Sequence, residues 1–234
     1  MPAIATHSRL ATPRSTAPAI VAGALRTSAA EDTATFDRVG TVISMRRDQV
    51  LCFEGDPARY CFKVVRGAMR GCRLLPDGRR HVMQFLLPGD LVAFDSQESY
   101  RATVEAVNDA TVIRYPRHAV DQLVQRHPRL GRSLLGKLCA DLCAAHVQML
   151  LLGRKNALER LASFLLAMSE RNDEDDRIEL PMTRSDIADH LGLTMETVSR
   201  SFTQLKACGV IELKASSEVL IRRREALQDI ADAA

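Results

Sequence analysis

The chain has 234 residues, of which 32 are Lys or Arg and 29 are Asp or Glu, so its formal net charge is +3. At roughly 150 residues per domain, this length suggests one or two domains, each able to bury a core. Hydrophobic residues at 46% and charged residues at 26% are ordinary values, which excludes disorder along the whole chain. No apolar run reaches about 18 residues, so the sequence excludes a membrane-spanning helix, and no membrane partner is expected. The charge neither indicates nor excludes a nucleic-acid partner.

Residues 1–30 predict a flexible tail. They are mostly Ala, Thr, Ser and Pro, and they lack the apolar periodicity that would offset the entropy lost on ordering. A signal peptide is the alternative, because residues 17–25 form a short apolar stretch behind two arginines. Pro18 and the few large apolar side chains in that stretch count against a signal peptide.

Cysteine usage predicts a reducing compartment. The six cysteines are scattered through a mid-sized chain, which is unlike a small disulfide-rich scaffold. They are Cys52, Cys61, Cys72, Cys139, Cys143 and Cys208. Reduced thiols in the cytoplasm are therefore expected.

Residues 36–116 predict short strands separated by turns. The predicted strands are rich in β-branched and aromatic residues and cover residues 41–43, 50–53, 61–65, 69–75, 82–87 and 112–115. Sequences such as Pro76-Asp77-Gly78 and Pro88-Gly89-Asp90 favour turns between them. Short strands at near-regular spacing predict an antiparallel barrel or roll, in which residues 69–87 form one hairpin.

After Pro128 the apolar pattern takes a helical period. Apolar residues recur at steps of three and four: Leu135, Leu138, Leu142, Ala145, Met149 and Leu152. This heptad seam predicts a helix of about 20–24 residues that ends at Gly153 and pairs with a second copy as a coiled coil. A helix buried within one subunit is the alternative. Such a helix normally has a wider apolar stripe, and Leu134 and Leu150 broaden this one.

Residues 156–177 predict a further helix and a loop. Asn156 and Glu159 form a start that resembles a capping box, and apolar residues between Leu158 and Leu166 share one face. Residues 170–177 are charged and mostly acidic, which predicts a solvated surface connector.

Residues 183–208 carry the strongest functional signal. Thr183 with Asp186 can cap a short helix, Gly192 permits a tight turn, and Thr194 can cap a second helix. The small Ala188, the turn glycine and an apolar anchor at Val198 have the spacing of a helix-turn-helix. A helical hairpin whose polar face only contacts water is the alternative.

The second of these helices has one buried and one polar face. Val198, Phe202 and Leu205 predict the buried side. Glu196, Ser199, Arg200 and Thr203 lie opposite, near the helix start, where recognition helices meet base edges. Arg200 can bond bidentately to guanine and Glu196 can accept from cytosine, while Ser199 can adapt to either partner.

The remaining sequence supports a DNA-binding domain. Residues 210–213 and 219–221 predict a β-hairpin wing, and Arg222–Arg224 then offer positive charge to phosphates. Residues 177–234 nevertheless contain eight Lys and Arg against nine Asp and Glu, a net charge of −1. The placement of the basic residues, rather than their number, must then support binding, so weak non-specific binding and a modest salt dependence are expected.

Several stretches match the motifs of one family. Residues 193–200 (LTMETVSR), 151–157 and 182–187 closely resemble the recognition helix and flanking segments of the CRP/FNR superfamily, in particular its FNR- and FixK-like branch. Residues 53–56 and 87–92 resemble turns of that family's β-roll. The resemblance covers residues 36–230 in the expected order.

The resemblance implies an α+β fold and a transcription regulator. It implies an N-terminal double-stranded β-roll of the jelly-roll or cupin type (residues 31–128), a long dimerisation helix (129–153) and a C-terminal winged helix-turn-helix (154–234). It also implies a homodimer that activates low-oxygen, denitrification or nitrogen-fixation genes, with palindromic double-stranded DNA of the TTGAT-N4-ATCAA type and RNA polymerase as partners.

The resemblance also implies roles for individual residues. Base contacts carry over to Glu196, Ser199 and Arg200, which stand unchanged here. Residues expected to contact the DNA backbone or to support the helices are Thr183, Arg184, Ser185, Thr194, Thr197, Thr203 and Lys206.

The chain departs from the family's known sensors, and no cofactor or metal is expected. The first cysteine is Cys52 and Ile113 occupies the late β-roll position, so thiolates for an iron–sulfur cluster are lacking. Residues 99–102 (SYRA) do not reproduce the Arg-Ser pair of members that bind cyclic AMP. Cys139, Cys143 and His146 could share a helix face toward a metal or haem. The simpler interpretation makes these cysteines small buried hydrophobes and the histidine solvated.

Two further alternatives follow. An effector-gated regulator would bind a nucleotide, haem or metal in the β-roll or along the dimerisation helix. An enzyme using Cys and His is not expected, because no nucleophile, base and orienting group occur in a recognisable motif. Cys208, about 18 Å along the second helix from Glu196, is a candidate redox thiol whose oxidation would add negative charge near phosphates. An inert packing residue is the alternative, because a helix C-terminus disfavours the thiolate.

Overall fold

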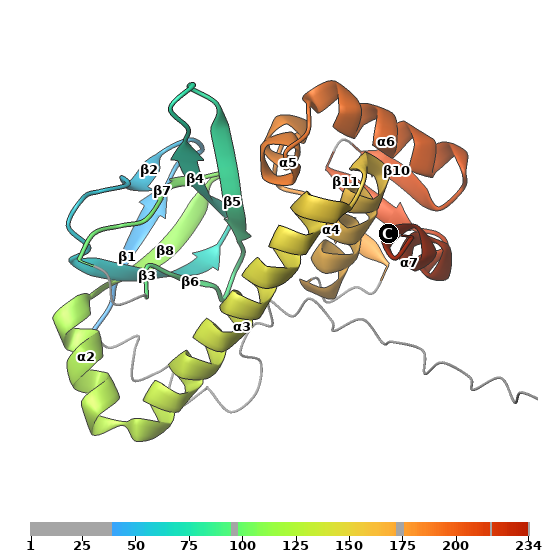
Figure 1. Cartoon of the computed structure of the whole chain (residues 1–234). Coiled ribbons are helices and arrows are strands. Elements are labelled where there is room, and N and C mark those ends of the chain that lie inside the picture. Colours follow the sequence, from blue (N-terminus) through green and yellow to red (C-terminus); the bar gives the residue numbers. More distant parts are fainter. Residues whose placement is uncertain (1–38, 95–97, 172–175, 216, 234) are drawn as a thin grey trace, which may run out of the picture.

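The computed structural model of the protein describes residues 39–94, 98–171, 176–215 and 217–233. The predicted tail at residues 1–30, and with it the signal-peptide alternative, lies outside the described residues. Figure 1 shows a β-domain and a helical domain joined by one long helix. This is the mixed fold that the sequence predicted, with a β-roll, a long helix and a helix-turn-helix in that order.

Two antiparallel sheets form the β-roll. Their strands are β1 (Thr41–Met45), β2 (Val50–Cys52), β3 (Tyr60–Arg66), β4 (Met69–Leu74), β5 (Arg80–Leu86), β6 (Leu91–Val92), β7 (Thr103–Ala106) and β8 (Ala110–Pro116). One sheet has the order β1-β8-β3-β6 and the other the order β2-β7-β4-β5. Alternate residues such as Phe62, Val64 and Met69 point into the core between the sheets. The predicted hairpin is confirmed as β4 and β5.

The sequence did not predict β6, β7 or the helix α2 (Arg117–Arg126). The two strands are only two and four residues long, so alternation gives almost no signal there. For α2 a signal was present, because Val120, Leu123 and Val124 lie at helical spacing and pack against β8 and α3.

The helix α3 (Pro128–Arg154) has 27 residues and is longer than predicted. Gly153 does not end it. A glycine inside a helix costs only about 1 kcal/mol, and the helix continues to Arg154 before Lys155 turns extended. Asn156 then begins the next helix, since its side chain accepts from the Glu159 N–H at 3.1 Å and its own N–H donates to the Glu159 carboxylate at 2.8 Å.

By length and composition α3 is also apolar enough to cross a membrane. This corrects the expectation that no stretch of the chain meets that test. The sequence argument required an uninterrupted apolar run, whereas a few charges such as Lys137 and Asp141 do not outweigh the leucines around them. Lys137 is buried against the β-roll, where its ammonium donates to Asp141 at 2.8 Å and lies 3.8 Å from Asp90.

The C-terminal domain is a winged helix-turn-helix. Its elements are α4 (Ala157–Arg171), β9 (Arg177–Glu179), α5 (Arg184–Leu191), α6 (Met195–Ala207), β10 (Ile211–Ala215), β11 (Glu218–Ile221) and α7 (Arg224–Ala231). The predicted wing hairpin is confirmed as β10 and β11. The predicted connector at residues 170–177 is partly wrong, because Arg171 ends α4 and Arg177 begins a third strand of the wing. Residues 172–175 lie outside the described part.

One hydrophobic cluster runs from the β-roll into the helical domain. It joins Val82 and Phe85 of β5 to Phe164 of α4 and to buried residues of α5 such as Ile187. The rings of Phe85 and Phe164 are 6.1 Å apart and nearly edge to face. The helix-turn-helix therefore packs on the β4–β5 hairpin as well as on its own helices.

Candidate nucleic-acid interface

The helix α5 begins with the predicted capping box. The Thr183 hydroxyl oxygen accepts from the Asp186 N–H at 3.1 Å, and the Asp186 carboxylate accepts from the Thr183 N–H at 3.0 Å. Both bonds satisfy N–H groups that a helix start would otherwise leave unpaired. The capping box therefore fixes the residue at which the first helix of the motif begins.

The predicted turn between α5 and α6 is also present. Gly192 has φ +64° and ψ +39°, a left-handed conformation that strains any residue with a Cβ. The N–H of Leu193 donates to the Ala188 carbonyl at 3.0 Å, which closes the end of α5. The Thr194 hydroxyl then accepts from the Thr197 N–H at 3.2 Å and starts α6.

The buried face of α6 contains Val198, Phe202 and Leu205, as the sequence predicted. Arg184, at the start of α5, lies over the Phe202 ring with its guanidinium carbon 3.3 Å from the ring centre. Burial lowers the pKa of Arg184 to about 10, and its Nη1 is buried without a hydrogen-bond partner. Arg184 thus joins α5 to α6.

The opposite face of α6 is exposed and polar. Glu196, Ser199, Arg200 and Thr203 all lie on it, the first three within the first two turns of the helix. The pKa of Glu196 is lowered by its own backbone N–H, then by the Thr194 hydroxyl and by the charge of Arg200. An ionised Glu196 beside Arg200 places an acceptor and a bidentate donor on one helix turn, the pair of groups that can read cytosine and guanine.

The other predicted DNA-facing residues are placed in two groups. The hydroxyls of Thr183, Thr194 and Thr197 are engaged in the caps, and Thr203 donates to the Ser199 carbonyl at 3.0 Å, so these residues support the helices. Ser185 and Lys206 are exposed, and phosphate contact by them stays a prediction.

The wing carries cations that are already paired. Lys214 lies 2.6 Å from the Glu212 carboxylate, and Arg222 donates to the same side chain. Lys214 and Arg222 hold the pKa of Glu212 below its usual range. Arg224 donates to the Ser169 hydroxyl at 2.7 Å, so only Arg223 of the three arginines has no described ion pair or side-chain hydrogen bond.

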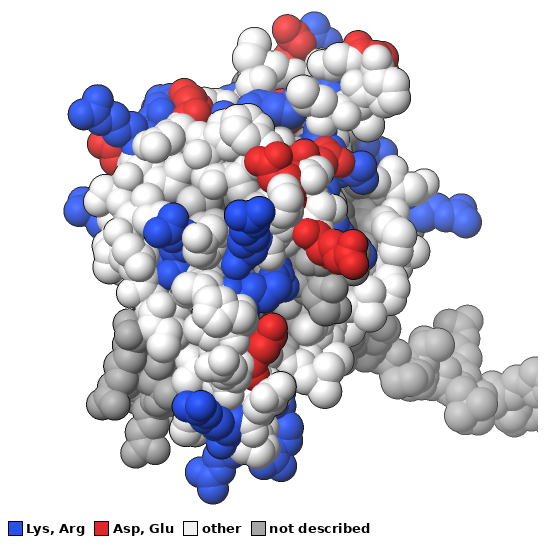
Figure 2. Space-filling view, turned by 90° about the vertical axis from the view of Figure 1, so that its left-hand side faces the viewer, with Lys and Arg blue, Asp and Glu red and all other residues white. Residues whose placement is uncertain are grey.

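Charge is mixed on the β-roll side of the molecule as well. Figure 2 shows basic and acidic side chains interspersed over that face, with basic ones also at its lower end, where α2 meets α3. This distribution agrees with the small net charge of +3. This face therefore carries charges of both signs rather than a large field of one sign.

The predicted dimer seam is exposed on α3. Leu135, Leu142 and Met149 are each about 60% exposed, Leu138 and Ala145 are exposed and Leu152 is half-buried. Such a row of large apolar side chains on one helix is rare in a monomer. Its spacing is that of a coiled coil.

Cys139, Cys143 and His146 are exposed beside this seam. In the single chain both cysteines are exposed, so their burial as small hydrophobes stays a prediction for the paired helix. Among the residues that the structure describes, no group of three His, Cys, Asp or Glu side chains could hold a metal ion.

The β-roll segment at residues 99–102 has a structural use. Tyr100 is buried, and its hydroxyl donates to the Tyr60 carbonyl at 3.0 Å. A hollow of about 410 Å³ lies elsewhere, between Cys61 and helices α2 and α3. Arg117 lines it but donates to the carbonyls of Ala58 and Ala93. An effector could enter this hollow, but Arg117, a cation that lines it, already donates to backbone carbonyls.

Cys208 lies at the C-terminal cap of α6, is exposed and forms no disulfide. The sequence did not identify Arg70, Arg80 or Asp189, which join the β-roll to α5. No local pattern could have found them, because each contact joins residues more than 100 positions apart.

Comparison with known families agrees with this architecture. Residues 42–127 match the model of a cyclic nucleotide-binding domain, and residues 159–230 match that of a Crp-like helix-turn-helix domain. Among solved structures, FixK2 from Bradyrhizobium japonicum is 39% identical with a TM-score of 0.80, covering 84% of this chain and 99% of that one. A CooA mutant from Carboxydothermus hydrogenoformans, with a TM-score of 0.72 and 21% identity, bears on the fold alone.

Relatives known by name are similar over most of both chains. The nitrogen fixation regulation protein FixK of Azorhizobium caulinodans is 38% identical over 195 residues, which cover 81% of this chain and 79% of the relative. The transcriptional activator protein FnrL of Cereibacter sphaeroides is 34% identical over 200 residues, covering 82% and 80%. Both names describe regulators rather than enzymes. The chain belongs to the CRP/FNR family of transcription regulators and carries that family's DNA-binding helix-turn-helix domain.

Proposed function

We propose that the protein is a homodimeric activator of the FixK/FNR type that binds a palindrome similar to TTGAT-N4-ATCAA. The observation that carries this proposal is the exposed row of Glu196, Ser199 and Arg200 at the start of α6, on a helix fixed by Thr194 and Gly192. The three residues have the chemistry to read bases in the major groove. The roles of the three residues come from the family resemblance and from this placement.

Dimerisation through α3 would give two such helices related by a twofold axis. A palindromic site has the same symmetry, with half-sites about one turn of DNA apart. The apolar seam from Leu135 to Leu152 supports this pairing. We infer that the seam contacts a second copy rather than lipid, so the dimer functions in the cytoplasm without a membrane partner.

The proposed target genes follow from the named relatives. FixK proteins are named for the regulation of nitrogen fixation, and FnrL is named as a transcriptional activator. We infer that this chain controls low-oxygen, denitrification or nitrogen-fixation genes, with RNA polymerase as its protein partner. It acts without an iron–sulfur cluster or a cyclic nucleotide, because residues 99–102 and the cysteine positions depart from the sensors that use them.

A binding-site selection tests the proposal. Purified full-length protein, with no effector added, is mixed with a pool of random duplexes, and the bound sequences are read after several rounds. The expected result is a palindrome with half-sites similar to TTGAT. The triple variant Glu196→Ala, Ser199→Ala, Arg200→Ala is the control and should enrich nothing above its starting pool.

Two results would contradict the proposal. Enrichment of unrelated or non-palindromic sequences by the wild type would show that the base-reading set or the dimer is misassigned. Enrichment that requires an added nucleotide or haem would favour the effector-gated alternative instead.

A further inference from the structure

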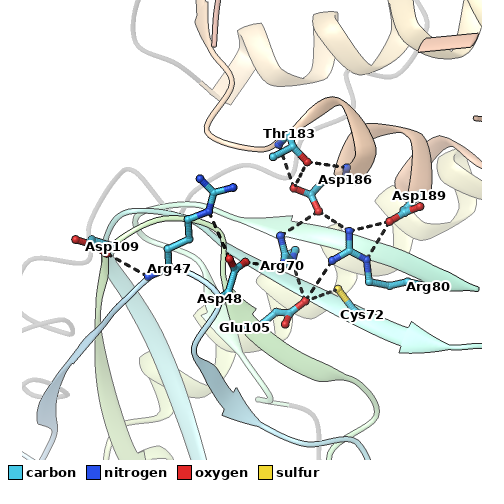
Figure 3. A network of polar contacts seen from close by, with 10 residues as sticks. All are labelled: Arg47, Asp48, Arg70, Cys72, Arg80, Glu105, Asp109, Thr183, Asp186 and Asp189. Atoms are coloured by element: carbon cyan, nitrogen blue, oxygen red, sulfur yellow. Dashed lines mark hydrogen bonds and ion pairs between the residues drawn. The ribbon is translucent and has the colours of Figure 1, made fainter. Parts of the chain in front are cut away.

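A polar network joins the β4–β5 hairpin to the first helix of the DNA-binding motif. Figure 3 shows two arginines of the hairpin, Arg70 and Arg80, pointing at carboxylates of α5. The carboxylates belong to Asp186, inside the capping box, and Asp189, one turn further along. The network therefore connects the sensor-like domain to the helix-turn-helix directly.

Arg70 is the buried centre of this network. Its side chain is only 8% exposed, and its three guanidinium nitrogens each meet a different carboxylate. Nη1 donates to Asp186 at 3.0 Å, Nη2 to Asp48 at 2.9 Å and Nε to Glu105 at 2.8 Å. A planar fork held on three sides fixes its own position and that of each partner.

Arg80 holds a second point on α5. Its Nε and Nη2 donate to Asp189 at 2.9 and 2.8 Å, and Nη2 also donates to Asp186 at 2.7 Å. Two histidine side chains add contacts to the backbone of the facing element. Nδ1 of His81 contacts the Asp189 carbonyl, and Nδ1 of His190 contacts the Val82 carbonyl. Contacts at two successive turns restrain rotation of α5 on the hairpin.

Asp186 serves the cap and the interdomain contact at once. Its side chain is 1% exposed and accepts from Thr183, Arg70 and Arg80. Burial raises the pKa of Asp186, but the Thr183 hydrogen bonds and the two arginine charges outweigh burial and leave the pKa below its usual range. The capped start of α5 is thus built onto the β-roll.

The network restrains a joint in the chain. Between α3 and α4 the backbone is extended at Lys155, where the domain could pivot on the dimerisation helix. Arg160 of α4 links the helices on either side of this joint, because it donates to the Leu152 carbonyl of α3 and to the Leu191 carbonyl of α5. Arg70 and Arg80 attach α5 to the β-roll. Both attachments restrain the orientation of the recognition helix relative to α3.

We propose that Arg70 and Arg80 are positioning residues that hold α5, and through it α6, at a fixed place relative to α3, and so set the half-site spacing that the dimer accepts. The inference rests on the proposed function, since it needs a dimer on a palindrome. Arg184 on the Phe202 ring and the Gly192 turn transmit the position of α5 to α6. Each recognition helix then meets DNA only where the two half-sites have the matching separation.

The ratio of carboxylates to arginines predicts what happens when one arginine of the network is removed. Four carboxylates surround the two arginines: Asp48, Glu105, Asp186 and Asp189. Removing Arg80 leaves these acids facing each other across the domain boundary with one arginine between them, and like charges repel. The boundary should then loosen, while α6 and its base-reading side chains remain folded.

The test is a spacing series. Dimer affinity is measured for palindromes whose central spacer is lengthened or shortened by one or two base pairs, and for a single half-site. One added base pair increases the separation of the half-sites by about 3.4 Å and rotates one relative to the other by about 35°. Wild type should therefore discriminate strongly between spacers. In Arg80→Ala the preference for the best spacer should fall by about tenfold, with half-site affinity unchanged.

Matched variants separate positioning from general damage. Arg79→Ala removes a neighbouring arginine whose only described ion pair is the exposed one with Asp77, so it should keep the wild-type spacing profile. Asp189→Ala, at a half-exposed position, should relax spacing as Arg80→Ala does. The double variant should relax it by less than the sum of the two, because removing Asp189 also relieves the repulsion left by Arg80→Ala.

The outcomes are distinguishable. An unchanged spacing profile in Arg80→Ala and Asp189→Ala overturns the positioning role. An equal loss of affinity at every spacer, half-site included, also overturns it, since that result reports damage to the DNA-binding domain. If wild type itself binds no palindrome at any spacing, the proposed function fails first, and this inference fails with it.

Discussion

The guanidinium of Arg70 lies 3.0 Å from the carboxylate of Asp186, although 116 positions separate the two residues in the chain. Asp186 also closes the capping box at the start of α5. One carboxylate therefore belongs to the local helix start and to the boundary between the domains. Substitutions in the DNA-binding motif and at this boundary should consequently have different and separable effects.

Arg200 is expected to contribute base recognition. Arg200→Ala should weaken binding to the selected palindrome by about 1–3 kcal/mol and relax the preference at the contacted base pair, because the bidentate donor to guanine is lost. Titration of the variant against the palindrome and its single-base variants measures both effects. Lys206→Ala is the control and should weaken all duplexes alike. Wild-type discrimination in Arg200→Ala would show that another side chain reads that base.

Leu142 is expected to lie at the centre of the dimer interface. Burying a leucine is worth about 1.5–3 kcal/mol, and Leu142→Glu removes two such contacts per dimer. The dimer should weaken by at least about 100-fold in sedimentation equilibrium. Leu150→Glu is the matched control, because Leu150 is equally apolar and 66% exposed but lies off the seam. Equal effects of the two variants would contradict the seam as assigned.

Gly192 is expected to be required at the turn of the motif. Gly192→Ala should destabilise the protein by about 1–2 kcal/mol, since φ is +64° and the nearest heavy atom to an added Cβ, Arg160 Nη1, is at an ordinary 3.5 Å. The cost is thus backbone strain rather than a clash. Gly153→Ala, in α3 with no neighbour within 4 Å, should instead stabilise by up to about 1 kcal/mol. Denaturant unfolding compares the two, and a harmless Gly192→Ala would refute the strain argument.

His190 should make stability depend on pH. Burial between Phe85 and Phe164 lowers the pKa of His190, and the nearby His81 lowers it further, although the bond to Val82 opposes this. The unfolded chain then binds a proton more readily than the folded protein. The free energy of unfolding is therefore unaffected by His190 above pH ~6.5, the pKa in the unfolded chain. Below that pH it falls by up to about 1.4 kcal/mol per pH unit until the pH reaches the lowered pKa of the folded protein.

Unfolding by denaturant between pH 7.5 and 5.5 measures this dependence. His190→Asn, whose amide can still donate to Val82, should flatten it, while the exposed His146→Asn should leave it as in wild type. If His190→Asn keeps the full pH dependence, another group is responsible.

Cys208 is expected to make DNA binding sensitive to peroxide. Oxidation of its exposed thiol to a sulfinate or sulfonate would add negative charge near the DNA backbone. Peroxide should therefore weaken binding of wild type by more than that of Cys208→Ala in a gel-shift titration. A variant with Cys139→Ala and Cys143→Ala, which removes the other two exposed thiols, should respond as wild type does. Equal loss in wild type and Cys208→Ala would reject the role.

Local patterns were sufficient for the DNA-binding motif. Thr183, Gly192 and Thr194 each act on backbone only a few residues away, as helix caps or as a turn. The positions of these caps and of the turn could therefore be predicted from the sequence. The apolar spacing of α6 likewise predicted its buried face. The pairing face of α3 stays a prediction, because it is exposed in the single chain. The short strands β6 and β7 could not be predicted, because two to four residues carry too little periodicity.

The same limit explains the partly wrong connector. Arg177–Glu179 is a strand only because β11 supplies its partner some 40 residues later, through pairs such as Ile178 with Val219. Charged residues around it favoured a loop when taken alone. Likewise, Gly153 looked like a helix end, although the helix continues one residue further to Arg154, because a glycine inside a helix costs only about 1 kcal/mol.

The sequence by itself determined that the chain has a helix-turn-helix with Glu196, Ser199 and Arg200 exposed, because caps, turn glycines and apolar spacing act over short distances. Tertiary structure alone decided how that motif is held. Arg70 and Arg80 are ordinary strand arginines until the fold brings α5 against the hairpin, and only there do their charges meet the buried carboxylate of Asp186. Contacts between residues more than 100 positions apart leave no local pattern, since they depend on the path of the whole chain.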